Sequence, residues 1–193
     1  MCSLNRHHSF RKRDMRHLPW LLAVLLFAPS VAAQQSTSAG PIIHSSGAVF
    51  AVPTPSFETN PDQSYKVAFE LAGASSSPDR LNPSLNTVAR FLNMHAQGGV
   101  PQDRVQAAVV VHGAAAWELL NDEGYRARHG VDNPNAALIR ELVRAGTKVI
   151  LCGQTAASRG ISHDGLVDGV QVALSAMTAF AMLQEQGFRV NPW

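Results

Sequence analysis

Cys152 is the residue of this sequence whose type and position point most directly to chemistry. It ends the apolar run "VIL" and is followed by Gly153 and by a short segment of small and polar residues, 154–158. A cysteine between a strand and a helix places its sulfur near free backbone N–H groups and the positive end of the helix dipole, which favours the nucleophilic thiolate. Free cysteine is also among the most buried residue types, so an inert core residue is the alternative.

The other cysteine, Cys2, lies in a segment with the features of a secretory signal. Residues 1–33 combine a basic start, the apolar run "LPWLLAVLLFAPSVA" and the small residues of 31–33. We expect cleavage after Ala33, a periplasmic or secreted location and no stable membrane span after cleavage; an uncleaved N-terminal anchor is the alternative. Cleavage leaves Cys152 as the single thiol, which is then buried and inert, paired between chains, or reactive.

The net charge argues against a nucleic-acid partner. The predicted signal carries five of the 16 Lys and Arg residues and one of the 14 Asp and Glu residues, so 11 basic and 13 acidic residues remain, a net charge of −2. Clustered Lys and Arg residues with interleaved aromatics, typical of nucleic-acid binding, are missing from that remainder.

His112 is the second candidate for chemistry, at the end of the apolar run "AVVV". It is a candidate proton shuttle, a ligand contact, or a histidine that hydrogen-bonds a neighbouring loop. His163 and Asp164 are adjacent in sequence, which does not make a catalytic pair, and we interpret them as turn residues.

Several cofactor and metal motifs are absent from the sequence. There is no Gly-x-Ser-x-Gly elbow, no Gly-x-Gly-x-x-Gly after the first strand and no phosphate loop. The histidines after the signal have no paired ligand spacing, and one thiol cannot build a structural zinc site or a dithiol. The run "GASSS" at 73–77 is only a weak indication of a flavin phosphate loop. We therefore expect no cofactor and no metal.

The elements that must position Cys152 alternate between strands and helices. Strands are expected at 65–72, 105–113, 147–152, 170–175 and 188–192, and helices at 82–98, 114–121, 133–146 and 176–187. Asn82-Pro83 and Asn133-Pro134 are predicted caps with proline in the first turn. This pattern predicts an α/β fold in three layers, with a mostly parallel sheet of about five strands covered on both faces by helices.

The domain organisation follows from the same pattern. Residues 1–33 are the predicted signal peptide, 34–64 an extended arm or linker rich in Ser, Gly and Pro, and 65–193 the α/β domain. The arm is expected to pack on the domain or on a neighbouring chain.

The predicted site lies at the carboxyl ends of the strands, where open parallel sheets place ligands and chemistry. The four main strands end in "LAGASSS", "VVHGAAA", "LCGQTAA" and "ALSAMTA". Cys152 is the candidate catalytic residue. The candidate binding residues around it are His112, Gly113, Gly153, Gln154 and Arg159.

The segments "VVVHG", "TKVILCGQTAASRGI" and "AMTAFAMLQEQGFRV", in this order, resemble the DsrE/DsrF-like family of small sulfur-relay proteins over roughly residues 65–193. The resemblance implies a flavodoxin-like α/β sandwich that forms dimers, trimers or hexamers. It also implies a cysteine that accepts sulfane sulfur as a persulfide and passes it on, here Cys152.

Three hypotheses for function follow. The first is an exported, oligomeric sulfur carrier or possible sulfurtransferase that acts through a Cys152 persulfide, with its sulfur donor and acceptor unidentified. The second is a non-catalytic oligomeric binding module with Cys152 buried, and the third is a redox sensor that oxidises at Cys152. The apolar residues Met177, Phe180, Ala181 and Met182 are consistent with burial of the last helix against another chain, or in the core of the same chain.

Overall fold

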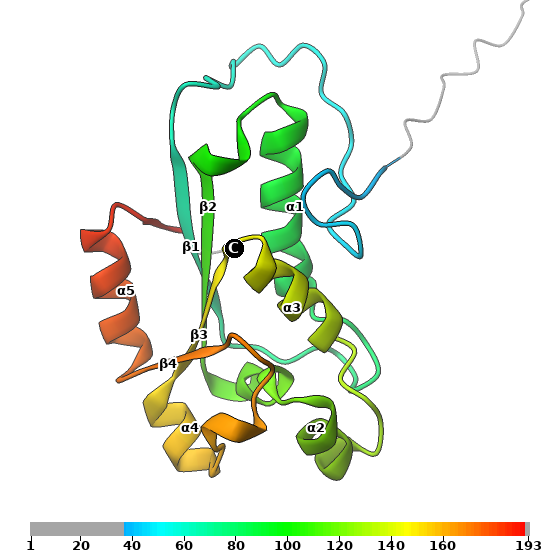
Figure 1. The fold of residues 1–193 in the computed structure, drawn as a ribbon, viewed down its shortest axis with the longest axis vertical. Helices are drawn as coiled ribbons and strands as arrows, with labels where there is room; N and C mark the ends of the chain where they lie inside the picture. The colour runs from blue at the N-terminus through cyan, green and yellow to red at the C-terminus, as the bar shows by residue number, and fades with distance from the viewer. Residues whose placement is uncertain (1–36, 192–193) are drawn as a thin grey trace, which may run out of the picture. The chain divides into compact units, whose positions relative to one another are not determined.

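The centre of the molecule is a sheet of five parallel strands. The computed structural model describes residues 37–191, so the predicted signal at 1–33 lies outside the described residues. The strands pair in the order β4-β3-β2-β1-β5, each parallel to its neighbours (Figure 1). The α/β fold with a parallel sheet of five strands, predicted from the sequence, is confirmed.

The elements of the fold follow one another in a regular alternation. In chain order they are β1 (Tyr65–Leu71), α1 (Pro83–Gln97), η1 (Gln102–Arg104), β2 (Val105–Val111), η2 (Gly113–Leu119), α2 (Asp122–His129), α3 (Ala136–Arg144), β3 (Lys148–Cys152), α4 (Gly153–Arg159), η3 (His163–Gly165), β4 (Gln171–Ala173), α5 (Ala176–Glu185) and β5 (Arg189–Asn191), where η marks a 3-10 helix.

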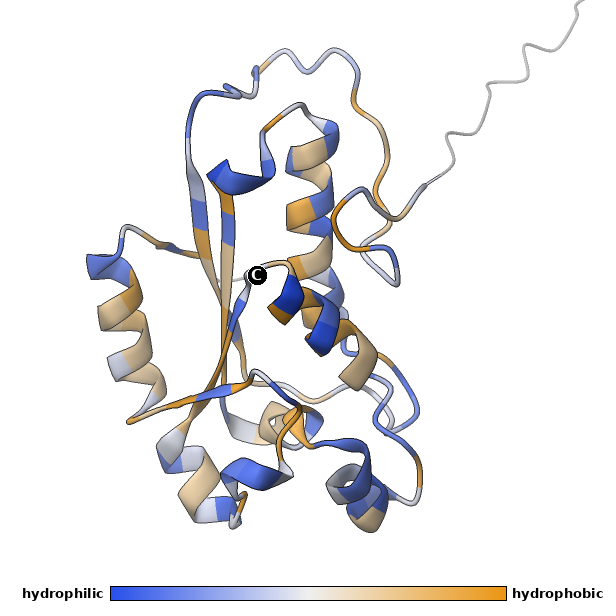
Figure 2. Ribbon diagram, in the orientation of Figure 1, coloured by the Kyte–Doolittle hydropathy of each residue, from blue (hydrophilic) through white to orange (hydrophobic). Residues whose placement is uncertain are grey.

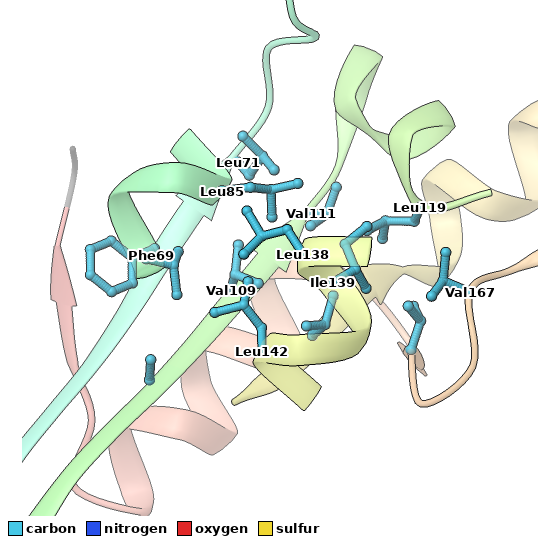
Figure 3. Packing of buried hydrophobic residues seen from close by; sticks show 14 of the residues in the cluster. Phe69, Leu71, Leu85, Val109, Val111, Leu119, Leu138, Ile139, Leu142 and Val167 are labelled. Atoms are coloured by element: carbon cyan, nitrogen blue, oxygen red, sulfur yellow. The ribbon is translucent and has the colours of Figure 1, made fainter. Parts of the chain in front are cut away.

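The two faces of the sheet are covered unequally. Helices α1 and α3 pack on one face and α5 on the other (Figure 1). The larger core joins α1, α3 and η2 to the strands through residues such as Val109, Leu138 and Leu142 (Figure 3). The smaller core joins α5 to small side chains of the strands, among them Ala68 and Ala108, which are fully buried. Apolar colour follows the strands and the inward sides of the helices (Figure 2).

Successive side chains along each strand point alternately to the two faces of the sheet, as strand geometry requires. Ala68, Val110 and Ile150 belong to the core under α5, whereas Val109 and Leu151 belong to the core under α1 and α3. Because paired residues of parallel strands point to the same face, this alternation assigns each residue at the strand ends to one side of the sheet.

The predicted cap of α1 is confirmed, but that of α3 is not. The Asn82 side chain accepts a hydrogen bond from the Ser84 N–H at 2.8 Å, with Pro83 in the first turn. Helix α3 begins only at Ala136, with Asn135 as its N-cap residue, and a turn at 134–135 separates it from the Asn133 side chain. That side chain accepts from the Asn135 N–H at 2.9 Å and donates to the carbonyls of Glu118 and Leu120.

The helix predicted at 114–121 is instead the 3-10 helix η2, followed by α2. The cause is a long-range contact: Leu119 and Asn121 are hydrogen-bonded through their backbones to Val167 and Gly165, at 2.9 and 2.8 Å. This pairing holds Leu120 in an extended conformation and interrupts the helix. The Asn121 side chain then caps α2 by accepting from the Gly124 N–H at 2.8 Å.

Residues 38–49 of the arm pack on α1 and α3. Ser38 and Val49 form an isolated antiparallel bridge, and Ile43 is fully buried. Asn93 of α1, also fully buried, accepts from the N–H groups of Ile42 and Ile43 and donates to the carbonyls of Ile43 and Gly47, at 2.8–3.1 Å. One side chain thus anchors a chain segment that has no strand ladder of its own.

The helices of residues 37–191 are all too short or too polar for a membrane crossing.

Replacing Asn93 by Ala should release this part of the arm. The change leaves buried N–H and carbonyl groups of the arm without partners, which costs about 1–3 kcal/mol of folding free energy. We expect a lower urea midpoint and faster proteolysis within 38–49. Gln97→Ala, which removes only two long hydrogen bonds to the same segment, an exposed one of 3.3 Å and a part-buried one of 3.5 Å, is the control and should change stability by less than about 0.5 kcal/mol. Equal effects of both variants would contradict the anchoring role of Asn93.

Candidate functional site

Cys152 is the last residue of β3 and the N-cap residue of α4. Its Cα pairs with that of Ala173 on the edge strand β4. Because Ile150, two residues earlier, belongs to the core under α5, the Cys152 side chain lies on the same side of the sheet as α5. The residue is 6% exposed. The predicted position between a strand and a helix is therefore the observed one.

The sulfur of Cys152 receives hydrogen bonds from two different helices. The donors are the backbone N–H groups of Gln154 and Thr155 and the Thr155 hydroxyl from α4, together with the N–H of Ala176, the first residue of α5. The N-terminus of α5 is fixed in turn by Ser175, whose hydroxyl accepts from the Thr178 N–H at 3.0 Å. The sulfur thus lies where two helices present free N–H groups and the positive ends of their dipoles.

These donors decide the ionisation of the thiol. Burial raises the pKa of Cys152, but the hydrogen bonds from Thr155, Ala176 and Gln154 more than offset it and hold the pKa below the ordinary value of 9.0. Hydrogen bonds to the charged form favour that form, so the site is built for a thiolate.

Gly153 allows β4 to lie this close to Cys152. A Cβ atom at this position would be 2.4 Å from the Ala173 carbonyl oxygen and 3.1 Å from that of Leu174. Gln154, the next residue, donates through Nε2 to the Leu174 carbonyl at 3.3 Å. Both predicted binding residues therefore contact the segment that leads into α5.

His112 lies at the end of β2, the strand next to β3, and is hydrogen-bonded to Glu70 of β1. The distance between His112 Nε2 and Glu70 Oε1 is 2.8 Å, and the two side chains are 29% and 49% exposed. The backbone N–H of His112 donates to the Leu71 carbonyl at 2.9 Å. Gly113 follows in the left-handed region with φ +57°, and a Cβ there would be 3.0 Å from the Ala72 carbonyl oxygen.

Arg159 lies at the opposite end of α4 from Cys152. Its guanidinium carbon is 5.4 Å from the centre of the Trp117 ring, over which Arg128 also lies at 3.5 Å. The contribution of Arg159 in this structure is a cation–π contact between α4 and η2. His163 and Asp164 form the exposed turn η3, in agreement with the interpretation of these two residues as turn residues.

A buried polar network holds the loop between β1 and α1 against η2. Glu118 is 2% exposed, and its carboxylate accepts from the Ser75 N–H and from the Asn82 side chain. The Asn82 N–H donates to the side chain of Asn135 at 2.8 Å. Both oxygens of this buried carboxylate have a partner, so the network holds the β1–α1 loop firmly to η2.

Cavity size does not identify this site. A hollow of about 710 Å³ lies between the arm and the end of α1. A groove of about 370 Å³ lies between β4 and α5 and is lined by Leu174, Thr178 and Met182 among others. No cluster of His, Cys, Asp and Glu suited to a metal ion occurs in the described part of the chain. The thiol environment, rather than a cavity, marks the candidate site.

Sequence reasoning missed three contributors. Thr155 and Ala176 donate to the sulfur, and Glu70 pairs with His112. The only signal for Ala176 was that the fourth strand also ended in small and polar residues. Glu70 had no signal, because one ionisable residue in a strand indicates only a position that reaches solvent.

A parallel α/β domain with a cysteine at a strand-to-helix junction is the class of protein that this fold and site define. A comparison with protein families matches residues 64–192 to the DsrE/DsrF-like family. The chain belongs to that family.

Two solved structures are similar to this chain. One is MTH1491 from Methanobacterium thermoautotrophicum, a protein of unknown function, with 20% sequence identity and a TM-score of 0.51; the match covers 67% of this chain and 99% of that one. The other is the ychN protein from E. coli, with 19% identity, a TM-score of 0.50 and the same two coverages. A comparison with curated proteins found no match.

The thiolate environment predicts how alkylation of Cys152 depends on pH. Its rate should have a midpoint below 9.0, because the thiol pKa is lowered by the four hydrogen bonds. Thr155→Val removes the hydroxyl and should move the midpoint upward. Ser158→Ala, which loses only a 3.0 Å bond to the Thr155 carbonyl, should leave the midpoint in place. Iodoacetamide labelling followed by mass spectrometry measures all three, and a wild-type midpoint at or above 9.0 would contradict the described environment.

Proposed function

We propose that this protein carries sulfane sulfur as a persulfide on Cys152 and passes it to an acceptor. The observation that carries the proposal is the set of hydrogen bonds from α4 and α5 to the sulfur, which favour the thiolate that must attack a donor. Membership of the DsrE/DsrF-like family, a family linked to sulfur relay, supports the same reaction.

The transfer follows from the chemistry of the thiolate. The Cys152 thiolate attacks the outer sulfur of a donor persulfide, a new S–S bond forms, and the S–S bond of the donor breaks. The electron pair of the broken bond leaves with the donor thiol. The sulfane sulfur changes partner without a net oxidant or reductant, and no cofactor takes part.

The same backbone donors serve both stages of the cycle. Before transfer they stabilise the thiolate, and after it they remain next to a persulfide anion of the same charge. Such a preorganised set of N–H groups does not need to rearrange between the loaded and unloaded states.

The location of the reaction follows from the predicted signal. Residues 1–33 would direct the protein to the periplasm or outside the cell, so the donor and acceptor would be found there. We propose a low-molecular-weight or protein persulfide as donor and a protein thiol as acceptor, since Cys152 provides one thiol and no resolving cysteine.

Sulfur loading on Cys152 is the direct test. Incubation with a persulfide donor should add the mass of one sulfur atom to the wild type and none to Cys152→Ala, and a reducing agent should remove the added mass. Intact-protein mass spectrometry measures the change. An unchanged wild-type mass, or an equal gain on Cys152→Ala, would rule out the proposed carrier.

Two other functions have an observation in their favour. The 6% exposure of Cys152 favours a binding or assembly module with an inert thiol, and the lowered pKa of that thiol also suits a redox sensor. Rapid native labelling of Cys152 separates a carrier from an inert thiol. A disulfide-linked dimer on non-reducing electrophoresis after oxidation identifies the sensor.

We also propose that the chain forms homo-oligomers through the edge formed by β4 and α5. Four apolar side chains stand exposed there: Val172, Leu174, Met177 and Met182, with exposed fractions from 42 to 80%. Exposed apolar clusters of this kind on a short edge strand and its neighbouring helix are typical of protein interfaces.

Charged substitutions should separate the oligomer. Leu174→Asp and Met177→Lys are each expected to shift the protein to a smaller species in sedimentation analysis, because a charge would be buried at the contact. Phe57→Asp is the control, since Phe57 is 93% exposed in the arm, and it should leave the species unchanged. A wild type that sediments as a monomer would disprove this interface.

A further inference from the structure

The hydrogen-bonded pair of Glu70 and His112 lies at the strand ends next to Cys152 and has no evident structural purpose. Its two side chains are partly exposed, and exposed ion pairs contribute little to stability. A 2.8 Å bond between Glu70 Oε1 and His112 Nε2 instead fixes the orientation of the imidazole ring. The other ring nitrogen, Nδ1, has no hydrogen-bond partner among residues 37–191.

The strand register places His112 beside Cys152. Residues 108–111 of β2 pair with residues 148–151 of β3 one for one, so His112 and Cys152 are the next positions along two neighbouring parallel strands. Neighbouring strands lie about 4.8 Å apart. Val110 and Ile150, which precede His112 and Cys152 by two positions, belong to the core under α5. The side chains of His112 and Cys152 therefore lie on the same side of the sheet.

Glu70 lies on that side too. It is two positions beyond Ala68, which also belongs to the core under α5, and β1 is the strand next to β2. Glu70, His112 and Cys152 thus occupy three adjacent strands on one face, in the order carboxylate, imidazole, thiol. No hydrogen bond joins His112 to the sulfur in the described residues, so a proton would pass when the donor binds or through one water molecule.

Few other charges face this group. On the same side of the sheet, Lys66 and Lys148 lie near the opposite, amino ends of β1 and β3. Helix α5 contributes Glu185 alone, at its last residue, and β4 contributes no ionisable side chain. Two ionisable residues that follow β2 and β3 in the chain have other partners: Glu118 is hydrogen-bonded to Asn82, and Arg159 lies over the Trp117 ring.

We propose that His112, oriented by Glu70, is the proton donor and acceptor of the sulfur transfer at Cys152. This assignment rests on the proposed function. It makes His112 a catalytic residue and Glu70 a positioning residue that acts through it.

The proton balance of the step is as follows. The Cys152 thiolate bonds to the outer sulfur of a donor persulfide, and the electron pair of the broken S–S bond stays on the donor sulfur. His112, in its imidazolium form, gives a proton to that sulfur, so that a neutral thiol leaves. The neutral imidazole then takes the proton of the new Cys152 persulfide, which leaves a persulfide anion and restores the imidazolium.

The experiment compares two reactions of Cys152 in the purified protein. Sulfur loading from glutathione persulfide releases a thiolate whose departure a proton donor assists, whereas alkylation by iodoacetamide releases iodide, which takes up no proton. We expect His112→Gln to slow sulfur loading by about 100-fold, the lower range for general acid catalysis. It should change alkylation at high pH by less than about twofold, because the amide donors that stabilise the thiolate remain.

Glu70 is tested through its dependence on His112. Glu70→Gln should slow loading by about tenfold, and the double variant Glu70→Gln/His112→Gln should be no slower than His112→Gln alone, because a residue that acts through another adds nothing once that residue is lost. The control is His163→Gln, a histidine in the exposed turn η3, which should load at the wild-type rate. His112→Asn repeats the test with a second side chain, and thermal melting confirms that each variant is folded.

The outcomes separate this inference from the proposed function. Wild-type loading with an equal rate in His112→Gln would overturn the role of His112 and leave the carrier function intact. Parallel loss of loading and alkylation would show that His112 supports only the thiolate or the fold, which also overturns the assignment. Absence of loading in the wild type would remove the carrier function, and the role of His112 with it.

Discussion

The pairing of β3 with β4 brings the N–H of Ala176 to the sulfur of Cys152, and the properties of the site depend on it. Cys152 lies opposite Ala173 in that pairing, and helix α5 begins three residues later. The close approach requires glycine at position 153, where a Cβ would collide with the Ala173 carbonyl. Burial raises the thiol pKa, whereas the donors of α4 and the N–H of Ala176 lower it. Together the hydrogen bonds outweigh burial, and the thiolate is favoured.

The unequal covering of the two sheet faces gives the domain a supporting side and a reactive side. Under α1 and α3 the core is large, and the arm and the network around Glu118 reinforce it. On the other face, α5 is the one helix of residues 37–191 that covers the strands, over the small side chains of Ala68 and Ala108. Polar groups at the strand ends, including Glu70 and His112, therefore remain accessible there, and so do the apolar side chains of the β4 edge. Chemistry and assembly are both proposed on this face.

Local sequence signals correctly predicted the elements that depend on interactions between residues close together in the sequence. The cap of α1 was predictable because Asn82 and Pro83 act within one helical turn. The prediction was wrong where a distant segment competes for the same groups. Leu119 and Asn121 bond to residues 165–167, which interrupts the expected helix. The Asn133 amide donates to the carbonyls of Glu118 and Leu120, and the N-cap residue of α3 is Asn135, two residues later. Neither competitor is visible in the local sequence, because the contact exists only after the chain has folded.

The sequence by itself determined the alternation of strands and helices, and with it the parallel sheet and the position of Cys152 at a strand end, because hydrophobic period and turn residues are local properties. It also determined that Cys152 is the only cysteine outside the predicted signal. Only the tertiary structure decided which groups surround the sulfur. Strand order placed β4 on one side of β3 and β2 on the other, and so brought Ala176 to the thiol and the pair of His112 and Glu70 beside it. These residues lie 24, 40 and 82 positions from Cys152 in the chain, and the order in which strands join a sheet is set by packing of the whole domain.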